Sequence, residues 1–102
     1  MKLRIAILAA VFFACASAAH AQAPATYTAK CQMCHGATGM GDTPAGKAMG
    51  AVAFKSAKLI AASDAEITAN IKAGKGKMPA FNGKLSDPEI AALVVYIRKL
   101  QK

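Results

Sequence analysis

The chain has 102 residues, 55% of them hydrophobic, with 13 basic and 5 acidic side chains and a formal net charge of +8. This length allows one domain, and no internal repeat, low-complexity tract or linker divides it. A positive charge can indicate nucleic-acid binding, but the basic stretches lack the interleaved aromatic side chains that such proteins use, and we exclude that class.

The first residues of the chain resemble a secretory signal peptide. Lys2 and Arg4 precede an apolar stretch over residues 5–16, and Ala19-His20-Ala21 then provides a small-x-small cleavage site. An uncleaved membrane anchor is the alternative, but the apolar stretch is too short to span a bilayer comfortably. We therefore expect a periplasmic protein without stable membrane insertion.

Cleavage after Ala21 would divide the chain into a signal peptide over residues 1–21 and a mature domain over residues 22–102, with cleavage after Ala23 as the near alternative. The mature domain carries 11 basic and 5 acidic side chains, a net charge of +6, and 48% hydrophobic residues, which is ordinary for a globular domain. At 81 residues, a core made of side chains alone is marginal.

A first helix is predicted over residues 24–34. Pro24 suits its first turn, and Tyr27 and Cys31 lie four residues apart on one face. The helix ends in the run Cys31-Gln32-Met33-Cys34-His35, in which two thiols lie three positions apart and a histidine directly follows the second.

This run is the signature of covalent haem attachment. Each thiol adds to one of two vinyl groups on the same edge of the porphyrin, and positions i and i+3 of a helix place the sulfurs about one turn apart. His35 then lies beneath the ring centre, where its neutral imidazole can bind the iron as the proximal ligand. We predict one covalent haem c, held by Cys31 and Cys34, which would also supply the missing core.

Three other interpretations of the thiol pair are weaker. A thioredoxin-like redox pair would need a βαβ setting, and the chain shows no convincing strand. A zinc site would need a second ligand pair, but no cysteine follows Cys34, and the only other histidine, His20, lies in the expected signal peptide. A structural disulfide would leave His35 unexplained.

The middle of the chain is rich in glycine. Residues 36–50 contain Pro44 and five glycines, and we predict that they form a long loop. Residues 51–62 are ambiguous and fit one short helix with Phe54 and Leu59 turned inward.

Two capping boxes mark the starts of later helices. Ser63 and Glu66 begin a helix that Gly74 stops, and Ser86 and Glu89 begin the last helix. The last helix is the strongest prediction, because apolar residues follow at helical spacing and basic residues occupy the final turns. These apolar residues are Ile90, Leu93, Val94, Ile97 and Leu100.

The haem motif, the long loop and the helices in this order closely resemble a class I c-type cytochrome, the small monohaem type of bacteria and photosynthetic organisms. The resemblance covers nearly all of residues 24–101. Its most specific parts are Cys31-Gln32-Met33-Cys34-His35-Gly36, Gly76-Lys77-Met78-Pro79-Ala80-Phe81 and Leu93-Val94-Val95-Tyr96-Ile97-Arg98. It implies an all-α cytochrome c fold, with three to four helices wrapped around one covalently attached haem.

In that family, the methionine of a Met-Pro pair before the last helix is the distal iron ligand, which implies Met78 here. Pro79 independently favours this choice, because it holds Met78 in an extended conformation on a preset loop. The alternative is that Met78 only packs, as most methionines do, and Met49 is then the credible rival. We expect His35 and Met78 to be the two metal ligands.

The resemblance also implies supporting residues. In that family a proline carbonyl in the loop accepts the hydrogen bond of the proximal imidazole, and Pro44 is the candidate here. Tyr27 and Tyr96 resemble the aromatic pair through which the last helix crosses the first. Six residues are expected either to line the haem pocket or simply to pack in the core: Phe54, Leu59, Ile67, Ile71, Phe81 and Leu93.

Lysines surround the predicted distal ligand: Lys72, Lys75 and Lys77 precede it and Lys84 follows it. If Met78 binds the iron, these lysines lie near the exposed haem edge and would steer the acidic docking surfaces of redox partners, such as a reductase, an oxidase or a dehydrogenase. A merely solvating surface is the alternative. We expect the protein to act as a monomer.

A thioether opposite an imidazole favours reduced iron and leaves no open position for a substrate. We therefore predict an exported electron carrier with no catalytic residues, which transfers single electrons between redox partners. Two alternatives are a haem-based gas or redox sensor and an electron-accepting subunit of a periplasmic dehydrogenase.

Overall fold

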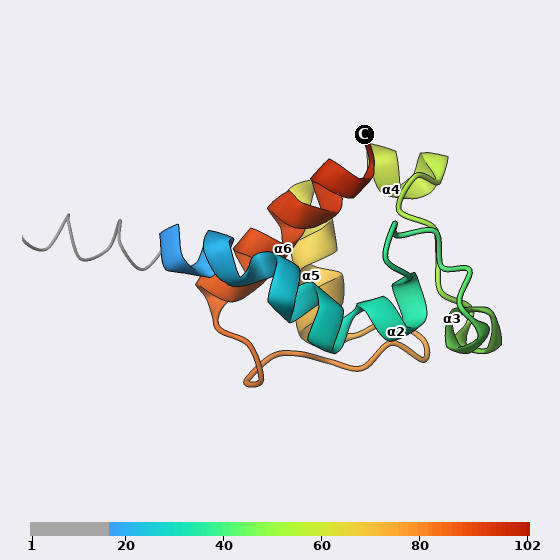
Figure 1. The fold of residues 1–102 in the computed structure, drawn as a ribbon, viewed down its shortest axis with the longest axis horizontal. Helices are drawn as coiled ribbons and strands as arrows, with labels where there is room; N and C mark the ends of the chain where they lie inside the picture. The colour runs from blue at the N-terminus through green and yellow to red at the C-terminus, as the bar shows by residue number, and fades with distance from the viewer. Residues whose placement is uncertain (1–16) are drawn as a thin grey trace, which may run out of the picture.

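The computed structural model describes residues 17–102, so most of the expected signal peptide, residues 1–16, lies outside the described part. Within residues 17–102 the secondary structure is helical, with two isolated β-bridges and no strand (Figure 1). The all-α prediction is confirmed. Residues 17–30 are helical and are followed by α2 (Gln32–His35), α3 (Pro44–Met49), α4 (Ala57–Ala61), α5 (Asp64–Ala73) and α6 (Asp87–Leu100).

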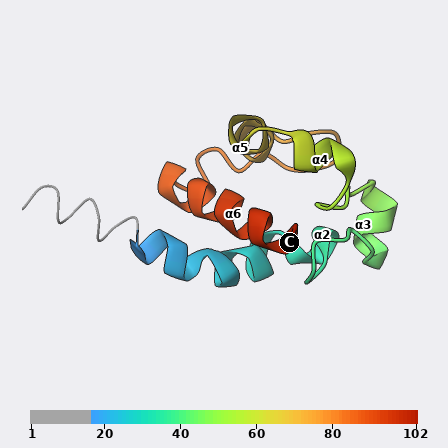
Figure 2. The ribbon, with the colours of Figure 1, turned by 90° about the horizontal axis from the view of Figure 1, so that it is seen from above.

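The helical segment over residues 17–30 lies beside α6 (Figures 1 and 2). Tyr27 is fully buried at this crossing, and its ring lies 5.1 Å from the ring of Tyr96, centroid to centroid, at an angle of 50°. Ala23 and Ala92 are both buried as well. The predicted aromatic crossing of the first and last helices is therefore confirmed.

Helices α5 and α6 begin at the two predicted capping boxes. Ser63 accepts a hydrogen bond from the Glu66 amide, and the Glu66 carboxylate accepts one from the Ser63 amide. Ser86 and Glu89 form the same pair at the start of α6. In each case the side chains satisfy amides that the first helical turn would leave without partners.

The buried core is built mainly on the inner faces of α5 and α6. Two ion pairs join their opposite ends, from Lys72 to Asp87 at 2.8 Å and from Arg98 to Asp64 at 2.9 Å, so the helices run antiparallel. The apolar stripe predicted for the last helix forms the centre of the core. The buried cluster comprises Tyr27, Phe54, Ile67, Ile71, Phe81, Leu85, Ile90, Leu93, Val94 and Ile97.

Our prediction of a continuous loop over residues 36–50 is wrong, because this stretch contains the short helix α3. The Thr43 side chain accepts a hydrogen bond from the Gly46 amide, Pro44 occupies the first turn, and Gly50 ends the helix with a φ of 71°. A threonine cap followed by proline is a helix-start signal that outweighs the glycines here. In the ambiguous stretch that follows, α4 is the short helix, with Phe54 buried and Leu59 half-buried.

The first helix also differs from its predicted range of 24–34. It is already helical at residue 17 and is interrupted by a turn at Cys31, after which α2 continues to His35. A second irregular segment, residues 74–86, joins α5 to α6 and runs along one side of the molecule in orange (Figure 1). No helix among residues 17–102 has both the length and the apolar character needed to cross a bilayer.

Candidate haem site

The turn at Cys31 places this thiol one helical turn before Cys34 and His35. The Cys31 amide donates to the Tyr27 carbonyl at 2.8 Å, and the His35 amide donates to the Cys31 carbonyl at 2.9 Å. The thiols of Cys31 and Cys34 are free and half-buried. Burial raises the pKa of Cys31 to about 11, which keeps that thiol neutral. The thiolate is the form that binds metal ions, so the neutral Cys31 thiol does not favour a thiolate metal site.

The His35 imidazole is held against Phe54. The two rings are stacked, with centroids 4.8 Å apart and planes inclined by 26°. Burial lowers the pKa of His35, and the nearby Val52 carbonyl opposes this more weakly. The imidazole is therefore neutral at pH 7, which is the form that binds iron.

The buried Nδ1 atom of His35 makes no hydrogen bond within the described residues. A buried polar atom without a partner is rare and marks a site that is incomplete as it stands. The backbone carbonyl that raises the pKa of this ring is that of Val52. It lies close by but makes no complete hydrogen bond to Nδ1. It is not that of Pro44, our candidate, because α3 takes Pro44 into its exposed first turn.

Side-chain contacts that we did not predict from the sequence fix the backbone around the motif. The buried Tyr27 hydroxyl donates to the Gly36 carbonyl at 2.6 Å. Thr43 donates to the Met33 carbonyl at 2.6 Å, and a methyl group on Gly46 would overlap the Cys34 carbonyl oxygen. The threonine-proline signal for α3 could have pointed to Thr43, but no local signal predicts these long-range contacts.

Met78 lies in the segment between α5 and α6 and packs, half-buried, against the core cluster. Its backbone pairs with Lys75 through two hydrogen bonds of 2.9 and 3.2 Å. At Gly74, whose φ is 75°, a Cβ would lie 2.6 Å from the Met78 carbonyl oxygen, so the loop folds back closely on itself there. The side chains of Met33, Met40 and Met49 are 75%, 44% and 50% exposed.

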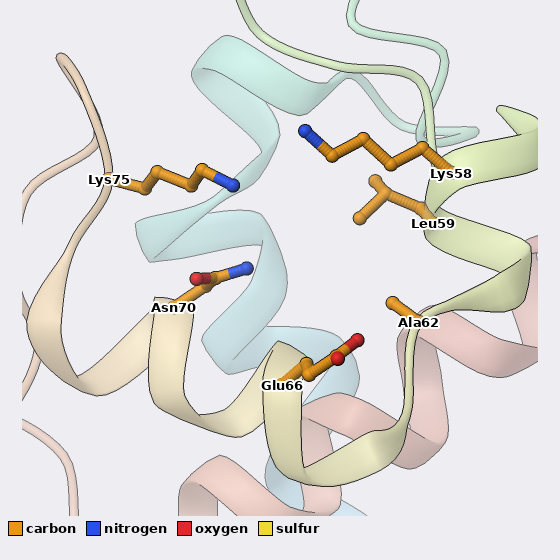
Figure 3. Close-up of a pocket in the computed structure, with 6 residues that line it drawn as sticks. All are labelled: Lys58, Leu59, Ala62, Glu66, Asn70 and Lys75. Atoms are coloured by element: carbon orange, nitrogen blue, oxygen red, sulfur yellow. The ribbon is translucent and has the colours of Figure 1, made fainter.

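A cleft of about 270 Å³ opens between α4, α5 and the segment that carries Met78 (Figure 3). Lys58 and Lys75 reach toward each other from its opposite sides, and the helix that carries the haem motif lies behind it. Of the six expected wall residues, Leu59 lines this cleft, and the other five belong to the buried core. The lining residues are Lys58, Leu59, Ala62, Glu66, Asn70 and Lys75.

These residues fit a covalently attached haem. Two half-buried free thiols, a half-buried neutral imidazole whose Nδ1 atom is buried without a partner, and a cleft in front of the motif helix would supply attachment, ligation and space. Comparison with known proteins agrees. Residues 18–97 match the family described as cytochrome c oxidase, cbb3-type, subunit III. The chain is also 35% identical to cytochrome c6 of Leptolyngbya boryana over 74 residues, which cover 70% of this chain and 80% of that protein.

The chain belongs to the cytochrome c family. As a member of the cytochrome c family, it is a small monohaem c-type cytochrome with one covalently attached haem c. Its general function is to carry electrons. The family match spans the motif helix, the cleft and most of α6, so it includes every residue that we singled out for haem binding.

Proposed function

We propose that this cytochrome is an exported single-electron carrier whose haem is attached to Cys31 and Cys34 and whose iron is ligated by His35 and Met78. The burial of Met78 carries the proposal. Among the methionines of residues 17–102, Met78 packs against the core, whereas the other three are largely exposed. A thioether ligand must be held in place and shielded from water, and the half-buried Met78 is closer to this condition than the three exposed methionines.

The haem supplies one-electron chemistry at the iron when it is bound. The chain determines how that chemistry is used. His35 presents a neutral nitrogen, and Phe54 holds its ring in place by stacking. Gly74 and Pro79 fix the loop conformation that presents the Met78 sulfur. Ligation on both faces would leave no position for a substrate, which favours a carrier over an enzyme.

The optical spectrum of the oxidised holoprotein tests Met78 as the ligand. We expect a sulfur-to-iron charge-transfer band in the unmodified protein and in Met49→Ala, the matched control, and its loss in Met78→Ala. A band that persists in Met78→Ala and disappears in Met49→Ala would overturn the assignment and identify Met49 as the ligand.

Carbon monoxide distinguishes the carrier from a gas sensor. A reduced iron with two firm protein ligands does not bind this gas, whereas a sensor needs an open or labile position. We expect the reduced protein at neutral pH to bind no carbon monoxide and the Met78→Ala variant to bind it. Binding by the unmodified protein would support the sensor function.

Within the proposed export, the burial of Ala23 supports cleavage after Ala21 and not after Ala23. Ala23 is only 4% exposed and belongs to the folded domain, whereas Ala21 and Gln22 are exposed. Cleavage after Ala21 keeps Ala23, and cleavage after Ala23 removes it. The mass of the protein purified from the periplasm identifies the first residue, and a full-length mass in the membrane fraction would contradict the proposal.

Membership in a larger oxidoreductase is the second candidate. It is favoured by the description of the matched family, which names a subunit of an oxidase. We expect the purified protein to elute as a monomer and to exchange electrons on collision. Stable co-purification with a larger redox enzyme would favour the subunit role instead.

A further inference from the structure

The last turn of α6 is tied to the segment that leads into and through α4. Gln101 donates from Nε2 to the Phe54 carbonyl at 2.9 Å, and Arg98 donates from Nη1 to the Leu59 carbonyl at 3.2 Å. The second terminal nitrogen of Arg98 donates to the Ala62 carbonyl. We call residues 54–62 the strap. Two side chains of the C-terminal turn therefore hold the strap at its start, middle and end.

These contacts satisfy groups that the strap cannot satisfy by itself. Helix α4 has only five residues, none of them fully buried, and its C-terminal carbonyls have no partner within the helix. The planar guanidinium of Arg98 bonds the Leu59 carbonyl of α4 and the carbonyl of Ala62, the residue after the helix, at once, and the single ammonium of a lysine does not have this geometry. Arg98 also donates to the Gln101 side chain at 3.0 Å and so orients it toward Phe54.

The strap forms part of the haem site. Phe54 stacks on His35 at its start, and Leu59 and Ala62 line the cleft further along. Its position therefore affects both the proximal imidazole and the width of the cleft. The ion pair between Arg98 and Asp64 lies outside these contacts, because the Asp64 side chain is 73% exposed.

We propose that Arg98 and Gln101 are positioning residues that clamp the strap over the cleft and keep exogenous ligands from the haem iron. The inference rests on the proposed function only in taking this cleft to be the place where the haem lies. Arg98→Met removes two of the three bonds to the strap, those to the Leu59 and Ala62 carbonyls, but keeps an apolar stem of similar length. Asp64→Asn is the matched control, because it removes the exposed ion pair and leaves the bonds to the carbonyls in place.

Hydrogen exchange in the holoprotein tests the clamp itself. The Ile60 and Ala62 amides are hydrogen-bonded within the strap, to the Ser56 and Lys58 carbonyls. We expect these amides to exchange about tenfold faster in Arg98→Met, with little change in Asp64→Asn. The buried α6 residue Leu93 separates local from global opening, because its amide would accelerate equally if the whole fold were merely weakened. Equal acceleration of all three amides would overturn the clamp.

Imidazole binding to the oxidised protein tests the consequence for the cleft. We expect Arg98→Met to bind imidazole severalfold faster than Asp64→Asn does. Faster exchange in the strap without faster imidazole binding would overturn the role in closing the cleft. If Arg98→Met fails to mature, Gln101→Leu removes one bond of the clamp and should give smaller changes in the same direction; no change would equally overturn the proposal. The exchange experiment does not depend on Met78, so failure of the proposed ligation would be recognised separately.

Discussion

Tyr27 shows how one hydroxyl can position the backbone beside a cofactor motif. Its ring packs between the first and last helices, while its hydroxyl reaches nine residues along the chain to the Gly36 carbonyl. Burial raises the pKa of this phenol, so it remains protonated and donates throughout the ordinary pH range. The residue directly after His35 is thereby held by a bond that a phenylalanine could not make.

We therefore expect Tyr27→Phe to lower the free energy of unfolding by about 1 kcal/mol, because the Gly36 carbonyl loses the hydroxyl and keeps only the longer bond of 3.2 Å from the Gly39 amide. Denaturant unfolding of the holoprotein measures this change. Tyr96→Phe is the control, since no hydrogen bond of the Tyr96 hydroxyl occurs within residues 17–102. An equal loss in both variants would show that the Tyr27 hydroxyl has no special role.

Gly46 offers a prediction in which two effects oppose each other. Replacing a helical glycine by alanine stabilises a helix by up to about 1 kcal/mol. At Gly46, however, the new methyl group would overlap the Cys34 carbonyl oxygen, and overpacking of this kind costs about 1–3 kcal/mol.

The overlap would lie between the new methyl group on α3 and a backbone atom of the haem motif, so neither the helix nor the motif can easily move away. We expect Gly46→Ala to destabilise the holoprotein and to lower the yield of covalently attached haem, measured by absorbance per mole of protein. A variant that is as stable as the unmodified protein would show that α3 can shift away from α2 without penalty.

At the scale of helices, the capping boxes explain why α5 and α6 could be predicted from sequence. Each start requires only a serine and a glutamate three residues later, and the structure contains both reciprocal pairs. We expect Ser86→Ala to lower the free energy of unfolding by about 1 kcal/mol in thermal or chemical melts. Ser86→Asp should preserve most of the stability, because aspartate can accept the same bond.

The capping box of α6 also predicts a pH dependence. Hydrogen bonds from the Ser86 amide and the Ser86 side chain lower the pKa of Glu89 below its ordinary value of 4.5. Because the folded pKa is the lower one, the stabilisation is complete above pH 4.5 and is lost as the pH falls through the folded value. We expect Glu89→Gln to show a weaker dependence of melting temperature on pH in this acidic range, and an unchanged slope would contradict the role of Glu89.

Over the whole molecule, positive charge surrounds the segment that carries Met78. Lys75, Lys77 and Lys84 are exposed there, and Lys72 is half-buried in its pair with Asp87. The C-terminus lies away from this segment in both ribbon views (Figures 1 and 2). A partner with an acidic surface would therefore be steered toward the proposed haem edge.

We expect Lys77→Glu to slow electron transfer to an acidic redox partner severalfold at low ionic strength, whereas Lys102→Glu, which changes the net charge equally, should have a smaller effect. Stopped-flow rates at increasing salt measure the difference, which should shrink as screening increases. Equal slowing by both variants would mean that only the net charge matters and that the docking is not directed.

The sequence by itself determined what depends on near neighbours along the chain: the haem motif over residues 31–35, the capping boxes and the apolar stripe of α6. Tertiary structure decided what depends on distant residues. Only the folded chain places the Val52 carbonyl near His35, α3 against the motif and the α6 turn on the strap. Helical signals act over three or four residues, whereas these contacts join residues 9 to 47 positions apart and leave no periodic trace in the sequence.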